Sequence, residues 1–192
     1  MRLIRWLTVA ALAIGAMLRV DAQTVARGWE VDVERSRVGF IASYNSIEIL
    51  GQFKRWQGQV RFDPRVPHDG QLLVDVDMAS VDSASRDRDV GIRSAEWFNS
   101  AKFGQARYKS QSITALTGNT FRVVAAFDIK GRRYPLISTF RWLPSADGYT
   151  RLQGAVTVDR RTFNIGSGEW ASDPIIGFEV KLEYDLYLRP QP

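Results

Sequence analysis

Along most of this chain, apolar and polar residues alternate with a period of two, and this pattern limits the fold more than any other feature. Between residues 178 and 188 every second residue is apolar, and Glu179, Lys181 and Glu183 lie between them. Because successive side chains of a strand point to opposite faces, the pattern predicts strands with one buried face. Similar segments occur at 29–33, 38–44, 56–62, 72–78, 108–113, 121–129, 134–142 and 152–158. Eight or nine such strands are enough to close an antiparallel barrel, so we expect a mainly β fold.

The stretch from residue 83 to 108 interrupts this alternation. Ser85 is followed by Asp87 and Asp89, and a helix N-terminus favours both a serine cap and negative charge. Trp97 and Phe98 then supply apolar surface without strand spacing. We therefore expect one or two short helices that cap one end of the barrel, where the mouth of a binding site would lie.

The first 22 residues have the composition of a secretory signal peptide. Arg2 and Arg5 precede an apolar run over 7–18, and small residues lead to a cleavage site after Ala22. A membrane-spanning helix needs roughly 20 apolar residues, and Arg19 interrupts this run too early, so an uncleaved anchor is the less favoured alternative. We expect an exported protein, periplasmic or extracellular, that begins at Gln23 and has no stable membrane anchor.

Residues 23–192 have the size and composition of a single domain. A chain of about 170 residues can bury a sizeable core. Removal of Arg2, Arg5, Arg19 and Asp21 lowers the formal net charge from +5 to +3, and acids are interleaved with the remaining basic residues. Nucleic-acid binding usually needs a concentrated basic face, so no nucleic-acid partner is expected.

The residues that usually carry catalysis are scarce. His68 is the single histidine and lies in a predicted turn, and there is no cysteine, so the usual zinc sites and the Ser-His and Cys-His pairs are excluded. Asp87 and Asp89 are flanked by Arg86 and Arg88 and fit helix-start acids or local ion pairs better than a catalytic pair. We expect no enzyme activity, no cofactor and no metal site.

Alternation alone does not fix which face of the barrel is inside, or whether the interior is hollow. An outer-membrane barrel places its apolar face outward, but several strands here are short for that and the chain ends in Arg189-Pro190-Gln191-Pro192. We favour the apolar face inward. Small residues on that face would leave room for a ligand, or alternatively mark bends of a filled barrel; they are Ala42, Gly58, Ala125 and Gly154.

Several short motifs occur in a fixed order along residues 29–188: Phe62-Asp63-Pro64, then Arg88-Asp89 with Ile92, Ser94 and Trp97-Phe98, then Asn99 to Phe103, Ile129-Lys130-Gly131, Arg161 to Gly166 and Gly168-Glu169-Trp170-Ala171. Taken together, these motifs resemble those of the YceI-like family of exported, lipocalin-like lipid-binding proteins. The chain departs from the family pattern at Gly104, where proline is usual, and at Asp159-Arg160, which precede Thr162 instead of an acid. We expect neither departure to touch the interior.

The resemblance implies an extended antiparallel barrel whose tunnel holds a polyisoprenoid or another long apolar lipid, such as a prenyl diphosphate or a quinone tail. The expected apolar lining is Phe40, Ala42, Tyr44, Val60, Phe62, Val74, Val76, Phe121, Val123, Ala125, Phe127, Leu136, Phe140, Val156, Phe178, Val180 and Leu182. The expected mouth and cap are Arg88, Asp89, Ile92, Trp97, Phe98 and Asn99.

Three functions are compatible with such a tunnel. Carriage, storage or sequestration of a lipid in the cell envelope is the leading hypothesis. The alternatives are an enzyme acting on isoprenoid lipids, for which no acid or base at the mouth is evident, and an accessory protein of a membrane redox system that uses quinone or a b-type cytochrome. A homodimer and a membrane cytochrome partner are left open.

Overall fold

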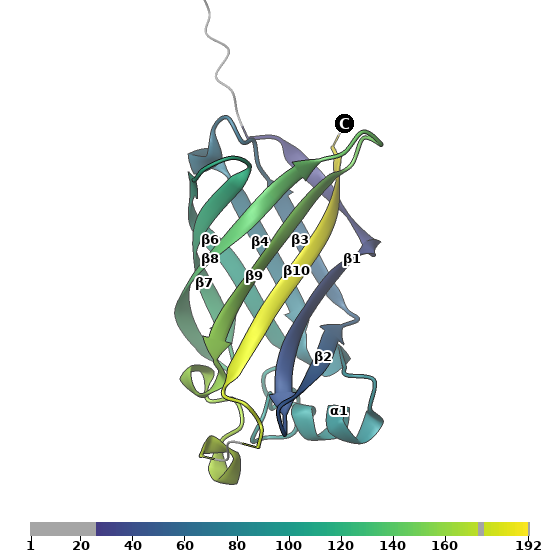
Figure 1. The fold of residues 1–192 in the computed structure, drawn as a ribbon, viewed down its shortest axis with the longest axis vertical. Helices are drawn as coiled ribbons and strands as arrows, with labels where there is room; N and C mark the ends of the chain where they lie inside the picture. The colour runs from purple at the N-terminus through teal and green to yellow at the C-terminus, as the bar shows by residue number, and fades with distance from the viewer. Residues whose placement is uncertain (1–25, 173–174, 192) are drawn as a thin grey trace, which may run out of the picture.

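The computed structural model describes residues 26–172 and 175–191, which form an antiparallel barrel with its long axis vertical in Figure 1. The expected signal peptide, 1–22, lies outside the described residues. The strands are β1 (Gly28–Tyr44), β2 (Ile47–Phe53), β3 (Trp56–Arg61), β4 (Gln71–Asp77), β5 (Val81–Asp82), β6 (Gln105–Ala115), β7 (Thr120–Ile129), β8 (Arg132–Pro144), β9 (Thr150–Asp159) and β10 (Glu179–Pro190).

The barrel closes because β10 pairs with β1, and its circumference is eight strands. β1 pairs with β2 from Gly39 to Tyr44 and with β3 at Gly28 and Trp29, so β2 and β3 together form one interrupted strand beside β1. In the same way, β4 pairs with β3 and β5 pairs with β2, so β4 and β5 occupy the next strand position of the barrel. The prediction of a mainly β, antiparallel barrel of about eight strands is confirmed.

Two details of the strand prediction are wrong. The predicted strands at 29–33 and 38–44 form one strand, β1, whose pairing with β10 shifts in register between Asp32 and Arg37. At this bulge the backbone N–H of Tyr187 donates to Ser36 Oγ at 2.8 Å, which replaces a lost ladder hydrogen bond. β2 was not predicted, because Leu50 and Gly51 break the alternation of its apolar residues.

The helical insert after β5 contains one α-helix in the described part of the chain, α1 (Arg86–Arg93). It begins after Ser85, whose hydroxyl accepts a hydrogen bond from the backbone N–H of Arg88, as the sequence predicted. Short 3-10 helices are η1 (Pro67–Asp69), η2 (Met78–Ser80), η3 (Arg160–Phe163) and η4 (Gly168–Ala171). Over the described ranges no helix combines the length and apolarity needed to cross a membrane.

The barrel end opposite α1 is filled by an aromatic cluster. Phe62 is fully buried, and its ring centre lies 4.9 Å from that of Phe121, 5.2 Å from Phe140 and 4.8 Å from Trp142. The Trp29 indole N–H donates to the Phe62 carbonyl at 2.8 Å, so the polar edge of that ring is also satisfied. Apolar side chains thus point inward, and this end of the barrel is closed by packing.

The small inward-facing residues do not all leave room. Ala125 is fully buried in the packed cluster, so the expectation of open space beside it is wrong. A Cβ on Gly154 would lie 2.2 Å from the ring of Tyr184, its cross-strand neighbour, and one on Gly51 would lie 2.2 Å from the ring of Phe40. These two glycines accommodate an aromatic ring of the next strand.

Candidate functional site: an apolar cavity open at the helical end

A cavity of about 500 Å³ occupies the half of the barrel nearest α1. Its walls are largely aliphatic and aromatic, contributed by strands around the barrel and by the helical insert. This volume falls within the roughly 300–1,000 Å³ of typical small-molecule pockets. Because water in such a space finds few hydrogen-bond partners, the cavity suits an apolar occupant.

The structure places many of the predicted site residues along this cavity. From the predicted barrel lining these are Phe40, Ala42, Tyr44, Val60, Val74, Val76, Phe127, Leu136, Val156, Val180 and Leu182. From the predicted mouth they are Arg88, Ile92, Trp97 and Phe98. Residues up to 142 positions apart in the sequence therefore meet around one space, as Phe40 and Leu182 do in direct β1–β10 pairing.

Six predicted lining residues lie elsewhere. Five belong to the packed end of the barrel: Phe62, Phe121, Val123, Ala125 and Phe140. The sixth, Phe178, precedes β10, and its half-buried ring lies 5.1 Å from the Arg160 guanidinium and 3.8 Å from that of Arg161. The five point inward as expected, but at a level of the barrel that is filled.

Two predicted mouth residues have local structural roles instead. Asp89 is buried and accepts hydrogen bonds from the Ser83 backbone N–H at 2.9 Å and from the Ser83 hydroxyl at 2.6 Å, which fixes the turn into α1. Asn99 has a positive φ of 49°, and its carbonyl accepts hydrogen bonds from the N–H groups of Lys102 and Phe103. Asparagine tolerates this left-handed conformation better than most residues, which accounts for its place in the turn.

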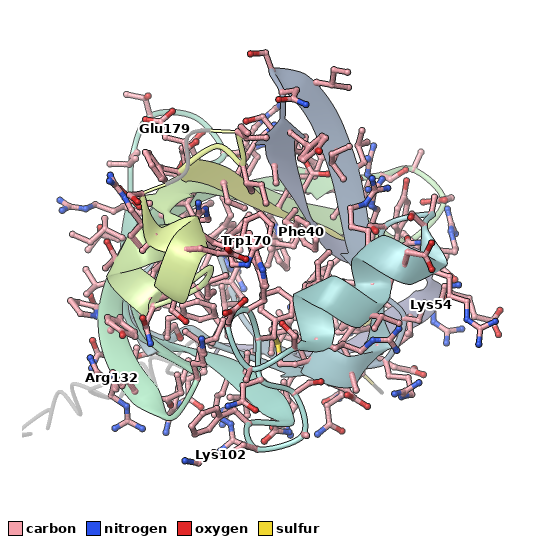
Figure 2. All side chains as sticks on the ribbon, turned by 90° about the horizontal axis from the view of Figure 1, so that it is seen from below. Phe40, Lys54, Lys102, Arg132, Trp170 and Glu179 are labelled. Atoms are coloured by element: carbon pink, nitrogen blue, oxygen red, sulfur yellow. The ribbon has the colours of Figure 1, made fainter. Side chains whose placement is uncertain are left out.

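The mouth lies at the barrel end that is covered by α1 and the loop after it from one side and by the segment containing η4 from the other; α1 and the η4 segment lie on opposite sides of this end in Figure 2. Glu96 joins the two: its carboxylate accepts from the Trp170 indole N–H at 2.8 Å, and its carbonyl accepts from the N–H groups of Gly166 and Ser167. The rings of Trp97 and Trp170 lie 6.0 Å apart, and both line the cavity. These contacts hold two separate segments in a fixed frame around the opening.

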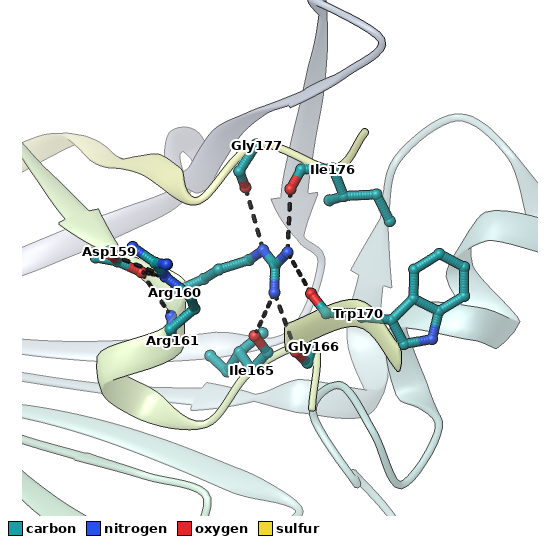
Figure 3. A network of polar contacts seen from close by, with 8 residues as sticks. All are labelled: Asp159, Arg160, Arg161, Ile165, Gly166, Trp170, Ile176 and Gly177. Atoms are coloured by element: carbon teal, nitrogen blue, oxygen red, sulfur yellow. Dashed lines mark hydrogen bonds and ion pairs between the residues drawn. The ribbon is translucent and has the colours of Figure 1, made fainter. Parts of the chain in front are cut away.

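Arg160 organises the η3–η4 side of this frame (Figure 3). Its side chain is 2% exposed, and its guanidinium donates to five backbone carbonyls, those of Ile165, Gly166, Trp170, Ile176 and Gly177, at 2.8–3.1 Å. A planar guanidinium has five N–H donors, so one side chain can tie together a whole irregular segment. The expectation that the departure at Asp159-Arg160 does not touch the interior is wrong, because Arg160 lines the cavity.

Three hydroxyl groups lie deep in the cavity, next to the packed end. The hydroxyls of Tyr108 and Ser138 are 3.2 Å apart, and Tyr184 lines the same region. Burial raises the pKa of Tyr108, and the hydrogen bond with the Ser138 hydroxyl partly offsets that rise; burial, together with the neighbouring Tyr108, raises the pKa of Tyr184 more strongly. Among the described residues the buried hydroxyls of Tyr134 and Tyr184 have no hydrogen-bond partner, and of these two Tyr184 lines the cavity.

The charged groups of the cavity wall are few and largely engaged. Arg88 donates to the Ser83 hydroxyl at 2.9 Å and to its carbonyl at 2.6 Å, so its cation stabilises the turn before α1. Within the described ranges, no three His, Asp or Glu side chains gather in a group that could hold a metal ion. His68 is an exposed residue of η1, 3.6 Å from the Asp69 carboxylate. The geometry therefore supports the binding of an apolar molecule better than a proton-transfer reaction.

Sequence reasoning missed part of the site. Arg160 and Tyr184 line the cavity, but arginine on a strand end is usually solvated and Tyr184 was counted as one more apolar strand residue. Trp170 was noted within a motif, without a place at the mouth. The one usable signal for these residues was the cluster of glycines at 166, 168 and 177, which indicates an irregular segment that needs a nearby anchor.

Comparison with known proteins agrees with this geometry. A family model described as a YceI-like domain matches residues 29–188. A UPF0312 protein of Azotobacter vinelandii is 31% identical over 139 residues, covering 71% of this chain and 72% of the relative. A UPF0312 protein of Pseudomonas fluorescens is 28% identical over 186 residues, covering 92% of this chain and 95% of the relative.

Solved structures share the barrel. Burkholderia cenocepacia BcnA superposes with a TM-score of 0.79 at 26% identity, covering 82% of this chain and 99% of BcnA. A Saccharophagus degradans protein described as a polyisoprenoid binding domain implicated in plant cell wall breakdown superposes with a TM-score of 0.66. Its identity is 14%, with 88% of this chain and 100% of that protein covered, so the second likeness concerns the fold.

Proposed function

The chain belongs to the YceI-like family, and from this premise and the cavity geometry we propose that it binds a long apolar lipid of the polyisoprenoid type inside the barrel. The observation that carries the proposal is the apolar cavity, packed shut at one end and open at the other. Such a blind tunnel accepts a flexible chain lengthwise and leaves its head group near the mouth. The description of the Saccharophagus degradans domain as polyisoprenoid-binding supports the same ligand class.

Burial of the tail is sufficient to hold such a ligand. At roughly 0.3 kcal/mol per heavy atom, the contact of a 40-carbon tail with protein would contribute on the order of 12 kcal/mol. Only the part of the tail that enters the cavity gains this energy, so longer chains would extend past the mouth. A charged head group is more stable at the mouth, because an ionised group in the apolar interior would lose its hydration without gaining a polar partner.

The protein acts in this proposal as a carrier, store or sequestering agent and not as an enzyme. Of the charged residues in the described lining, Arg88 and Arg160 donate to Ser83 and to backbone carbonyls, and Glu183 lies 3.9 Å from Arg37 and 3.7 Å from Lys181, so all three are engaged in structural contacts. An accessory role in a membrane redox system remains compatible with the same cavity, since a quinone tail is also a polyisoprenoid. Identification of the bound lipid separates these two roles.

We further propose that the protein is exported through a cleaved leader and acts in the periplasm. The support is the sequence of residues 1–22, with its charged start, apolar run and small residues before Gln23. N-terminal sequencing of the exported protein should begin at Gln23. Recovery of an intact Met1 from the membrane fraction would contradict export as a free protein.

The binding proposal is tested by native mass spectrometry of the protein purified without detergent. A bound species with the mass of a polyprenyl or quinone lipid is expected, and organic extraction should release it. Delipidated protein should then take up a polyprenol at one equivalent per chain. Protein that neither carries lipid after purification nor takes up polyprenol would contradict the proposal.

A further inference from the structure

Exposed apolar side chains gather at the open end of the barrel. Of the eight large apolar residues that are exposed in the described part of the chain, five lie on segments around the mouth, on the β1–β2 hairpin, on α1 and before β10. These five, which we call the apolar rim, are Tyr44 at 49%, Ile47 at 65%, Leu50 at 53%, Val90 at 60% and Ile175 at 45% exposure. Groupings of this kind on a protein surface mark sites of interaction.

The rim is continuous with the cavity. Tyr44 lines the cavity and is also half exposed, and it pairs with Ile176, another lining residue. The neighbouring Asn45 N–H donates to the Ile175 carbonyl at 2.8 Å, which joins the hairpin tip to the segment before β10. The tip itself turns through Asn45 and Ser46, both with positive φ, so the hairpin makes a tight turn with Ile47 directly across from Tyr44.

We infer that the apolar rim docks the mouth of the barrel onto a lipid bilayer, so that the ligand passes between membrane and cavity without crossing water. This inference rests on the proposed function, because the ligand is then a lipid whose natural source is a membrane. A fluid bilayer can accommodate apolar side chains that project separately from a hairpin, a helix and a loop. A protein partner bound at the same place would cover the exit of the cavity.

The charges of the rim indicate which bilayer it fits. Glu48 lies between Ile47 and Leu50 on the hairpin, and Arg86 and Asp87 accompany Val90 on α1; all three charged side chains are exposed. Acidic and basic side chains are therefore mixed around the apolar rim. Docking relies on the insertion of apolar side chains into the interfacial region and does not require anionic lipid. Moderate salt should leave it unchanged, because screening acts on charged pairs.

Matched substitutions can isolate the rim. Ile47→Asp, Leu50→Asp and Val90→Asp alter rim residues that do not line the cavity. Ile137→Asp is the matched control, because Ile137 on β8 is 52% exposed, nearly the same as Leu50 at 53%, and like Leu50 it points outward, but it lies in the middle of its strand, away from the mouth. Circular dichroism and thermal unfolding of each variant check that the barrel is intact.

The experiment measures two quantities for each full-length exported protein. The first is co-flotation with phosphatidylcholine vesicles, with and without phosphatidylglycerol. The second is uptake of a fluorescently tagged polyprenol, supplied either in those vesicles or from a dilute ethanol dispersion. We expect each rim variant to lose roughly tenfold in vesicle binding and in the rate of uptake from vesicles. Uptake from the dispersion should remain at the wild-type level, and Ile137→Asp should match wild type in both assays.

The outcomes separate this inference from the function on which it rests. Uptake from vesicles that is equal in the rim variants and in Ile137→Asp would overturn docking while leaving lipid binding intact. Failure of the wild type to take up polyprenol from either source would overturn the proposed function itself. Vesicle binding that requires phosphatidylglycerol and disappears in salt would show an electrostatic surface, which contradicts docking through the apolar rim. A wild-type protein that forms dimers and does not bind vesicles would assign the apolar rim to contact with a second copy of the chain, which contradicts docking onto a bilayer.

Discussion

Replacing Arg160 by methionine should loosen one side of the cavity mouth. Methionine has a similar length and keeps the apolar contacts of the stem, but it supplies none of the five hydrogen bonds that the guanidinium donates at 2.8–3.1 Å. The five backbone carbonyls come from the segment between residues 165 and 177, which includes η4. The change therefore removes the common partner of an irregular segment in a single step.

The size of the effect follows from the number of bonds and from what water can replace. At about 1.5–3 kcal/mol per hydrogen bond to a charged group, five bonds would sum to roughly 7–15 kcal/mol, which is the entire stability of an ordinary domain. That sum is an upper bound, because the carbonyls lie near the mouth and can be hydrated once the segment moves. We expect a loss of about 3–5 kcal/mol, as for the breaking of a buried charged interaction, and a fall in Tm of roughly 6–20 °C.

Two measurements and two controls test this prediction. Thermal unfolding followed by circular dichroism gives the change in Tm, and limited proteolysis with an enzyme that cleaves after glutamate reports loosening of the backbone around Glu169, an exposed residue of η4. Arg161→Met is the matched control, because Arg161 is exposed and pairs with Asp159 outside the network. Arg160→Lys keeps the charge and up to three donors and should fall between methionine and wild type. Equal Tm values and equal cleavage for the two methionine variants would refute the role given to Arg160.

Three further results are expected. Ala42→Trp places an indole in the cavity, so bound lipid should be lost with little change in Tm. Ala125→Trp overpacks the closed end and should lower the free energy of unfolding by about 1–3 kcal/mol and the Tm by roughly 2–12 °C. If calorimetry showed the larger fall in Tm for Ala42→Trp, and mass spectrometry showed the loss of lipid in Ala125→Trp only, the division into a filled end and a hollow end would be contradicted. The free energy of unfolding should fall as pH rises above about 10, the ordinary pKa of tyrosine, because folded Tyr108 and Tyr184 retain protons that the unfolded chain releases. Urea titrations between neutral and alkaline pH should show this slope, and it should be smaller in Tyr184→Phe. Lipid affinity should change little with salt, since apolar burial supplies most of it, and a steep decline in a transfer assay would indicate a charged site.

The sequence predicted the barrel because the signals for it are local. Period-two alternation specifies strands and their inward faces, and Ser85 with the acids after it marks the start of α1. β2 escaped notice because Gly51 replaces an apolar side chain where Phe40 occupies the space across the pair. The bulge in β1 likewise depends on Ser36 and its partner in β10, which are 151 residues apart.

The extent of the cavity could not be predicted from alternation, because that pattern carries no information about position along the barrel axis. Phe62 and Phe127 both point inward, yet Phe62 is packed among other aromatic rings and Phe127 lines open space. The difference depends on which strands bring large residues to the same level, and that is set by register. Arg160 could not be placed for a related reason, since a buried arginine depends on five carbonyls from residues that follow it in irregular backbone.

The two ends of the barrel divide stability and binding between them. A hollow interior gives up the contacts that a packed core would provide, and a void of this kind costs stability in proportion to its volume. The closed end offsets that cost with large aromatic side chains: Phe62, Phe121, Phe140 and Trp142 are each at most 3% exposed. It follows that truncations at the closed end should lower stability with or without ligand, while truncations of the cavity wall should show most of their effect when lipid is bound. A barrel of this length can therefore keep an empty half folded and available to its ligand.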